Sequence, residues 1–243
     1  MTFQPVVPFS GVAGWSFLNR TREAQEAAFQ ASPSLERQVA YFEDNIGKIT
    51  SAQDLVDDRQ LLQVMLGAFG LDDDINAKAY IREVLDQGTL EPSSLANRLT
   101  DKRYLAMSEA FGFDLDPPNT QLSAFPAQIS ELYRGRQFEV AVGNSQPDLR
   151  VALALERDLP ALLDRGLSDE ANWFTSMATP SLRPVFEKAF ALPITVATLD
   201  VDRQLEIFRE KAQAFFGDST VAQFSAAEIM DTLRDRFLAQ SGL

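Results

Sequence analysis

The residues with the spacing of a metal-binding loop lie between 72 and 83. Four oxygen-bearing side chains occupy positions 1, 3, 5 and 12 of a calcium-binding EF-hand loop: Asp72, Asp74, Asn76 and Glu83. Ala77 replaces the glycine that the loop requires at position 6, and residues 75–87 have a helical period that could not wrap an ion. We therefore predict no metal site, and we interpret Asp72 to Asp74 as acidic residues that face the N-terminal dipole of that helix.

A pair of basic residues could bind an anion. Arg134 and Arg136 lie close together, with Glu139 one turn further along, in a chain that is otherwise acidic. Guanidinium groups bind carboxylates and phosphates well, so both arginines are candidates for an anion site. The favoured alternative is that Arg136 pairs with Glu139 or with a carboxylate of a neighbouring helix, while Arg134 stays solvated.

Three further carboxylates could be imagined as the acid pair of a glycosidase: Glu156, Asp158 and Asp164. On a helix, however, residues 156 and 158 point to different faces. We therefore interpret this group as a charged face in contact with solvent.

The chain contains no histidine and no cysteine. It lacks the commonest general base and metal ligand, and it can form neither disulfides nor thiolate nucleophiles. No other pattern indicates a catalytic residue or a cofactor. The sequence therefore predicts a protein that is not an enzyme and that carries no metal and no cofactor.

The N-terminal segment differs from the rest of the chain. Its residues 5–20, "PVVPFSGVAGWSFLNR", hold a single charge, Arg20, beside the apolar Trp15, Phe17 and Leu18. These four residues could dock into a groove of another protein or act in export. The favoured alternative is a strap that packs across the core of the protein itself.

Charge and hydropathy restrict the partners. Acidic residues number 35 and basic residues 22, so the net charge is −13. Such a surface repels nucleic acid and anionic membranes. No apolar run approaches the roughly 20 residues that span a bilayer, and no basic segment precedes the first apolar residues as in a signal peptide. We expect a cytoplasmic protein that neither binds nucleic acid nor inserts into membranes.

The elements that must position these residues are helices. Apolar side chains recur at helical spacing, as in Leu205, Phe208, Ala212 and Phe215, and no stretch shows the alternation of a strand. The pattern predicts helices over these ranges: 15–30, 34–47, 52–69, 75–87, 93–111, 121–142, 148–165, 181–191, 200–216 and 226–240.

Helix ends are marked by glycines and by capping hydroxyls. Seven of the 12 glycines follow periodic segments, where the left-handed C-cap residue belongs: Gly47, Gly70, Gly88, Gly112, Gly143, Gly166 and Gly217. Start signals pair a hydroxyl with a residue of the first turn: Ser51 with Asp54, Ser225 with Glu228, Ser32 with Pro33 and Thr179 with Pro180.

One helix ending recurs along the chain. The phrases "MLGAFGLD" (65–72), "MSEAFGFD" (107–114) and "FEKAFALP" (186–193) end alike, with alanine in place of glycine in the third. We predict a buried ring in the last turn of three helices: Phe69, Phe111 and Phe190. Gly70 and Gly112 should then have positive φ.

The segments that precede the first two endings are similar as well. Each consists of a helix, a short link and a second helix, with Phe69 and Phe111 lying 42 residues apart. The sequence therefore predicts an all-α fold, a compact multi-helix bundle of duplicated helix–link–helix units with a period near 40 residues. We divide it into a strap and first helix (1–30), an N-terminal repeat half (31–116) and a C-terminal half (117–243), within one globular unit.

Three stretches resemble a known family. The runs 132–163, "LYRGRQFEVAVGNSQPDLRVALALERDLPALL", and 173–193, "WFTSMATPSLRPVFEKAFALP", together with 199–224, are similar to the bacterial family called domain of unknown function 1217. The resemblance covers roughly residues 20 to 240. It implies an all-helical fold and, because such genes often lie among flagellar genes in alphaproteobacteria, a connection with the flagellum.

These observations favour a protein that binds other proteins, as an accessory or assembly factor associated with the flagellum. The alternative is a helical domain that binds a small molecule or is an enzyme. The first reading requires an exposed apolar surface. The second requires a concave pocket with convergent polar groups.

Overall fold

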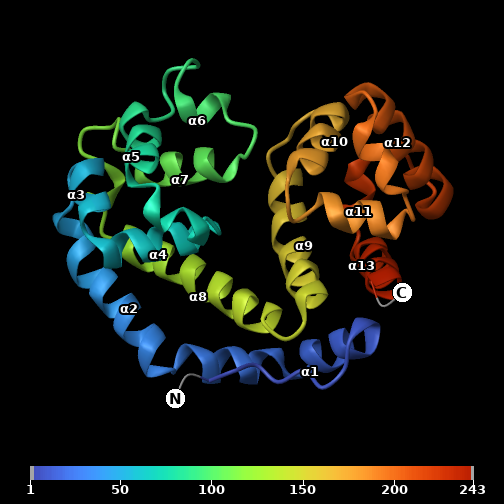
Figure 1. The fold of residues 1–243 in the computed structure, drawn as a ribbon, viewed down its shortest axis with the longest axis horizontal. Helices are drawn as coiled ribbons and strands as arrows, with labels where there is room; N and C mark the ends of the chain where they lie inside the picture. The colour runs from blue at the N-terminus through green and yellow to red at the C-terminus, as the bar shows by residue number, and fades with distance from the viewer. Residues whose placement is uncertain (1–2, 242–243) are drawn as a thin grey trace. The chain divides into compact units, whose positions relative to one another are not determined.

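The structure, a computed structural model, describes residues 3–241 and confirms an all-α fold (Figure 1). No strand occurs among these residues. The α-helices are α1 (Gly11–Gln30), α2 (Pro33–Asn45), α3 (Ala52–Asp57), α4 (Arg59–Phe69), α5 (Lys78–Gln87), α6 (Leu95–Arg98), α7 (Arg103–Phe111), α8 (Phe125–Gly143), α9 (Pro147–Leu163), α10 (Asp169–Ala178), α11 (Arg183–Ala189), α12 (Val201–Phe216) and α13 (Ala227–Ser241). Five 3₁₀ helices lie between them: η1 (Ile46–Lys48), η2 (Asp72–Asn76), η3 (Asn119–Gln121), η4 (Ile194–Thr198) and η5 (Val221–Ser225).

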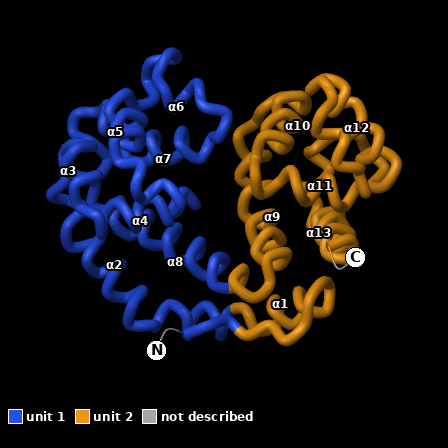
Figure 2. The backbone as a smooth tube through the Cα atoms, in the orientation of Figure 1, with its two compact units in different colours: residues 1–5, 23–141 blue, residues 6–22, 142–243 orange. Residues whose placement is uncertain are grey.

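The described residues form two compact units (Figure 2). Unit 1 takes 3–5 and 23–141, and unit 2 takes 6–22 and 142–241. This division differs from the sequence-based one, which separated 31–116 from 117–243. The stretch 114–121 belongs wholly to unit 1, because Asp114 accepts hydrogen bonds from the backbone of Thr89 and Leu90, and Thr120 donates one to the carbonyl of Ile49.

Each unit has a core of its own. In unit 1, the ring of Phe111 packs edge-on against Phe125 at 5.0 Å and against Phe69 at 6.4 Å between centroids. In unit 2, Trp173 is fully buried and lies 5.3 Å from Phe186 and 5.9 Å from Phe208. Phenylalanine has no polar group to satisfy, so these rings can fill both interiors without hydrogen bonds.

The recurring helix ending has the predicted local structure. The rings of Phe69, Phe111 and Phe190 are all buried. Gly70 and Gly112 have φ of 69° and 57°, as the left-handed C-cap requires. The repeat with a period near 40 residues stays a prediction.

The third copy makes the same cap without glycine. Leu71 N donates to Leu66 O in the first copy, and Leu192 N donates to Glu187 O in the third, the long hydrogen bond of a Schellman motif. Ala191 therefore adopts φ of 50°, which makes it the one non-glycine residue with positive φ among those described. The backbone geometry of the motif is kept although the residue type is unfavourable.

Two predicted helices are interrupted. The range 52–69 breaks at Asp58, whose carboxylate accepts from the N–H groups of Gln60 and Leu61 and so starts α4. The range 93–111 contains only the short α6 and then α7. Helix α10 was not among the predicted helices, although Ser168 caps it by accepting from Ala171 N.

The predicted start signals had mixed outcomes. Ser51 accepts from Asp54 N, as expected. Ser32 occupies the N-cap position before Pro33, as predicted, but its hydroxyl donates to Phe29 O and caps no N–H group. The Ser225–Glu228 box is wrong, because α13 begins at Ala227 and the hydroxyl of Ser225 donates to Ala222 O instead. Thr179–Pro180 does not start a helix either, because α11 begins at Arg183.

Among residues 3–241, no helix has both the length and the apolar character needed to cross a bilayer.

Candidate functional site

Two of the four predicted docking residues are buried within unit 2. Trp15 and Leu18, on α1, are almost completely excluded from solvent. The guanidinium of Arg234, from α13, lies 4.7 Å from the centroid of the Trp15 ring, in a cation–π contact. Trp15 and Leu18 therefore anchor the segment to its own unit and cannot reach a partner.

Arg234 joins this anchor to a network of charges. Its side chain is only 9% exposed and forms ion pairs with Glu156 at 3.2 Å, Asp231 at 2.6 Å and Asp235 at 3.1 Å. Glu156 also pairs with Arg22 of α1 at 3.0 Å. Because the buried guanidinium of Arg234 is costly to leave unpaired, its ion pair with Glu156, which also binds Arg22, links α1 to α9 and α13.

Residues 6–10 fold back over the start of α1. A Cβ added to Gly14 would lie 2.2 Å from the carbonyl oxygen of Phe9, so only glycine allows this approach. Gly14 N donates to Ser10 O at 3.1 Å, and Gln146 donates to Val7 O at 3.4 Å. Val7 itself is buried. Residues 6–10 therefore lie along unit 2, and we call this stretch the strap.

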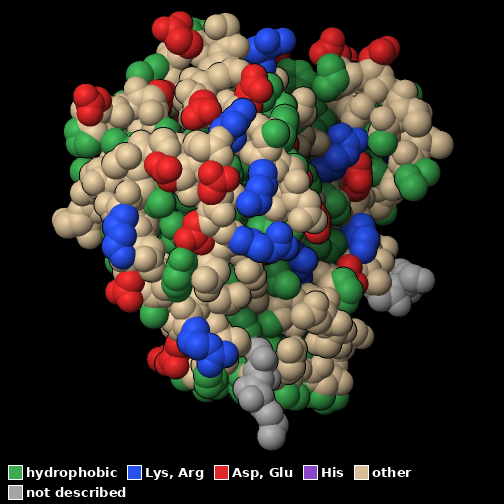
Figure 3. All heavy atoms as spheres, turned by 60° about the vertical axis from the view of Figure 1, so that its left-hand side comes forward, with side chains coloured by type: hydrophobic (Ala, Val, Ile, Leu, Met, Phe, Trp, Pro, Cys, Tyr) green, Lys and Arg blue, Asp and Glu red, His purple; other side chains and the backbone are tan. Residues whose placement is uncertain are grey.

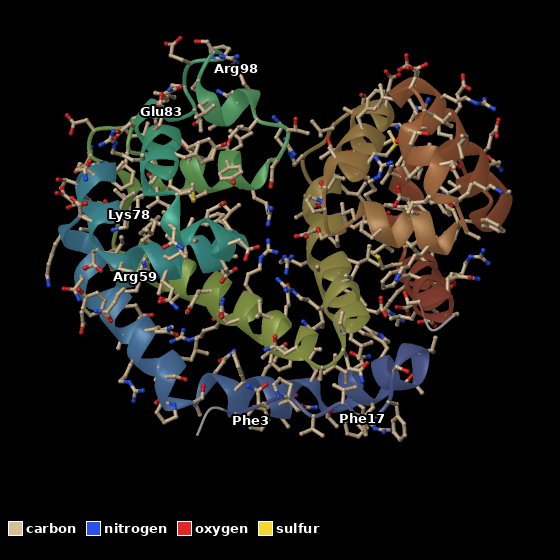
Figure 4. The ribbon with its side chains drawn as sticks, in the orientation of Figure 1. Phe3, Phe17, Arg59, Lys78, Glu83 and Arg98 are labelled. Atoms are coloured by element: carbon tan, nitrogen blue, oxygen red, sulfur yellow. The ribbon has the colours of Figure 1, made fainter. Side chains whose placement is uncertain are left out.

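The outer side of this strap carries apolar side chains in contact with water. Val6 is 62% exposed, Phe9 55% and Val12 38%. The ring of Phe17 lies 6.4 Å from that of Phe9, edge to face, and the guanidinium of Arg20 lies 5.9 Å from Phe17. Figure 4 shows Phe17 on the side of α1 that is turned away from α9. We call Val6, Phe9, Val12 and Phe17 the N-terminal apolar face.

Other exposed apolar side chains occur along the chain, among them Ile194, Leu90 and Leu122. On the face drawn in Figure 3, acidic and basic side chains are interspersed, and hydrophobic side chains form small separate patches. The N-terminal apolar face stands out because residues 6–19 contain no charged residue at all.

The EF-hand-like residues of unit 1 do not form a calcium loop. Asp72 accepts a hydrogen bond from Gln137 at 3.1 Å, and Asp74 accepts one from Tyr104 at 2.7 Å. Both belong to the 3₁₀ helix η2 and not to the first turn of α5, which begins at Lys78. Glu83 is exposed on α5 (Figure 4). No group of three or more potential acidic ligands occurs within 3–241.

Burial and neighbouring aspartates raise the pKa of two tyrosines in unit 1. Burial and the hydrogen bond to Asp74 raise the pKa of Tyr104 well above its usual value. Burial and the charge of Asp72 raise the pKa of Tyr133 to about 12. Both phenols are therefore held neutral, which suits a hydrogen-bonded structural role and not a proton-transfer role near pH 7.

The two arginines predicted as an anion site are not brought together. Two positions apart on α8, Arg134 and Arg136 face different directions. The guanidinium of Arg136 lies beside Gly70, as does that of Arg103, which donates to the Gly70 carbonyl. Arg103 in turn pairs with Asp101 at 2.6 Å. Burial alone would raise the pKa of Asp101, but the hydrogen bonds from Arg103 outweigh it and lower that pKa.

The three carboxylates considered for a glycosidase have separate environments. Glu156 belongs to the Arg234 network, whereas Asp158 pairs with Arg157 at 2.8 Å and accepts from Ser181 at 2.5 Å. Asp164 is exposed after the end of α9. Glu156 and Asp158 are less exposed than the solvent face we expected, because each is enclosed by its partners.

Val6, Phe9 and Val12 were not predicted to be the exposed residues of this segment. The signal was present, since an uncharged apolar stretch with two prolines precedes the helix. Which of its side chains anchor the strap and which face water depends on Arg234, more than 200 residues away in sequence.

Comparisons with known proteins agree with this fold. The model of a family described as "Protein of unknown function (DUF1217)" matches residues 68–230. A crystal structure of protein AGR_C_984 from Agrobacterium tumefaciens is similar, with a TM-score of 0.79 and 22% identity over 99% of this chain and 98% of that one. At this identity the likeness shows the fold alone. Among curated proteins, none matches the chain significantly.

Proposed function

The chain belongs to the DUF1217 family of proteins of unknown function, and we propose that it acts by binding another protein rather than as an enzyme. The observation that carries this proposal is the N-terminal apolar face, where Val6, Phe9 and Val12 are exposed next to a firmly anchored Trp15. Contact of such an apolar surface with water is unfavourable, and the free energy falls when a partner covers it.

The anchoring makes the face suitable for binding. Trp15, held by Arg234, and Gly14, held against Phe9, fix the backbone before any partner arrives. A partner that binds a fixed surface does not have to order it first, so more of the contact energy appears as affinity. The edge-to-face pair of Phe9 and Phe17 offers a rigid aromatic centre, the residue class that dominates binding energy at interfaces.

A flagellar protein is the partner that we propose to test first. The resemblance of this chain to its family implies a connection with the flagellum, and an assembly factor needs a surface of this chemistry. The environments of the candidate catalytic carboxylates also favour binding over catalysis. Glu156, Asp158 and Asp164 have separate surroundings, and the first two form ion pairs with arginines.

The proposal predicts a contact at Phe9 in the living cell. A photo-crosslinking phenylalanine analogue placed at position 9 should form a specific adduct with a partner on illumination. The matched control is the same analogue at Ile194, which is 92% exposed on unit 2 but lies outside the face. An adduct at position 9 and none at 194 supports the face, and equal labelling at both positions contradicts it.

Two variants separate binding from folding. Phe9→Ser with Val12→Ser removes two partly exposed side chains, so it should abolish the adduct of a reporter at position 6 while lowering the melting temperature far less than Trp15→Ala does. Trp15→Ala should lower stability by about 3–5 kcal/mol, because it leaves a large cavity. If a strain carrying the double variant swims as well as the parent, the flagellar part of the proposal fails. Loss of the adduct without loss of motility would leave the binding part standing.

A further inference from the structure

A second aromatic side chain is exposed on unit 2, at the end of α12. Phe215 is 41% exposed, and its inner side stacks on the buried ring of Phe190, with 27° between the ring planes and 6.4 Å between the centroids. Its position is therefore fixed by the core while part of the ring faces water.

Arg236, from α13, covers this ring. Its guanidinium carbon lies 4.0 Å from the ring centroid, the distance of a stacked cation–π pair. Its Nε donates to Ala189 O at 3.1 Å, which caps the last turn of α11. The two terminal nitrogens have no hydrogen-bond partner within residues 3–241. A guanidinium held in this way presents its remaining N–H groups in the plane of the fork, as carboxylate binding requires.

Lys211 brings a second cation to the same ring. Its Nζ lies 5.7 Å from the centroid of Phe215, one turn along α12. No acidic residue of the described chain forms an ion pair with Lys211 or with Arg236. The charges of Lys211 and Arg236 are therefore not neutralised by an ion pair within the described residues, whereas those of Arg183, Arg209 and Arg234 are.

We propose that Arg236, Lys211 and Phe215 form a receptor for an acidic segment of a protein partner. A carboxylate of that segment pairs with the free edge of the Arg236 fork, a second is attracted by Lys211, and an apolar side chain of the segment covers the exposed part of Phe215. This inference does not depend on the N-terminal apolar face, which is uncharged and suits a different kind of contact.

An acidic peptide fits these groups better than the other anions available. A nucleic acid or an anionic membrane needs an extended basic surface, which two neighbouring cations in an acidic chain do not provide. A short segment needs only the local pair of cations and the ring. The ring of Phe215 can contact an apolar side chain while the guanidinium of Arg236 beside it binds a carboxylate. A peptide in which apolar and acidic residues alternate offers both groups.

The test uses the whole protein and a defined probe. The probe is a blocked peptide of sequence Glu-Glu-Leu-Glu-Glu-Leu-Glu-Glu, and the control peptide has glutamine at every glutamate. Nuclear magnetic resonance of the ¹⁵N-labelled protein follows the Nε–H signal of Arg236, which its bond to Ala189 should keep visible. We expect saturable shifts of this signal and of the amides around 211–217 with the acidic peptide, weakened by added salt, and none with the control.

Variants assign the effect to the receptor. Lys211→Gln does not alter the capping bond, and it should weaken binding several-fold. Arg236→Gln should weaken it by at least about 10-fold, which corresponds to about 1.4 kcal/mol. Arg236→Lys, which retains the charge but not the fork, should recover only part of the loss. The matched control is Arg203→Gln, at the other end of α12, which should leave binding unchanged.

Three outcomes would overturn the inference. The first is equal shifts with both peptides. The second is a loss of binding in Arg203→Gln as large as in Lys211→Gln. The third is binding to phosphatidylserine vesicles that Arg236→Gln abolishes while the acidic peptide causes no shift, which would assign the site to a lipid surface. Because Lys211→Gln removes only a partly exposed charge, the test does not depend on whether Arg236→Gln folds.

Discussion

At the scale of single residues, the conformation of Ala191 shows how strongly the surrounding helix end dictates the backbone. A left-handed alanine costs about 1 kcal/mol relative to glycine, yet φ at Ala191 is 50° and the Schellman hydrogen bond from Leu192 to Glu187 is made. The backbone must turn between the buried Phe190 and Pro193, and this turn places residue 191 in the left-handed conformation.

Ala191→Gly should therefore stabilise the protein. We expect a gain of about 0.5–1 kcal/mol in the free energy of unfolding, because glycine adopts positive φ without the clash of Cβ. Urea denaturation followed by circular dichroism measures it. The matched control is Gly112→Ala, which should destabilise, since φ is 57° and the new Cβ would lie 2.7 Å from Asn119. A loss of stability in Ala191→Gly would contradict this account of the cap.

The tyrosines provide a test of the polar contacts in unit 1. All four tyrosines have a raised pKa: Tyr41, Tyr80, Tyr104 and Tyr133. For Tyr104 and Tyr133 the largest cause is burial, and both lie near the aspartates of η2. A raised pKa in the folded state means that the folded protein holds these protons when the unfolded chain, with a pKa near 10, has lost them.

Stability should therefore be complete below about pH 10 and fall as the pH rises from there through the folded pKa values, of which that of Tyr133 is about 12. Ultraviolet absorbance of phenolate should appear at higher pH in the native protein than in urea. Tyr104→Phe should flatten the alkaline loss while costing about 1 kcal/mol at neutral pH through the lost hydrogen bond to Asp74. A native titration that coincides with the unfolded one would contradict the burial of these phenols.

At the scale of elements, capping residues close in sequence mark the ends of helices such as α4 and α7, whereas contacts between aromatic rings pack the helices together. Phe111, in the last turn of α7, is the centre of unit 1, because it touches Phe125 of α8, Phe69 of α4 and Phe113 beyond its own cap. The same helix end thus supplies both the stop signal, Gly112, and the core residue.

Phe111→Ala should lower the free energy of unfolding by about 3–5 kcal/mol, because three neighbouring rings would line the cavity that it leaves. Denaturation in urea measures the loss. The comparison variant is Phe113→Ala, whose ring is only half-buried and whose loss should be clearly smaller. A cost below about 1 kcal/mol for Phe111→Ala would show that the helices close around the gap.

At the scale of the whole molecule, the tryptophans and the tyrosines, which give distinct optical signals, lie in different units. Both tryptophans, Trp15 and Trp173, belong to unit 2, and all four tyrosines belong to unit 1. Each unit also buries a core of its own. The two units can therefore be followed separately in one experiment, without a label.

We expect Phe111→Ala to shift the unfolding transition seen by tyrosine absorbance far more than the transition seen by tryptophan fluorescence. The physical reason is that its cavity lies in the core of unit 1, and domains with separate cores can unfold separately. Leu205→Ala, in the core of unit 2, should give the reverse pattern. Coincident shifts of both probes in both variants would show that the chain unfolds as a single cooperative unit.

The amino-acid sequence by itself determined the helical class, most helix positions, and the C-caps at Gly70 and Gly112, because these depend on side chains within a few residues of one another. It also marked the N-terminal segment as unusual. Only the tertiary structure decided the division into units, since α1 and α8 carry no local signal at 22 or at 141. It likewise decided that Trp15 is an anchor and Phe9 is exposed, and that Arg236 stacks on Phe215. Those outcomes depend on contacts between residues far apart in sequence, such as Trp15 with Arg234 and Ala189 with Arg236. The local sequence around a charge or a ring does not specify such a partner, because the contact forms only when the chain folds.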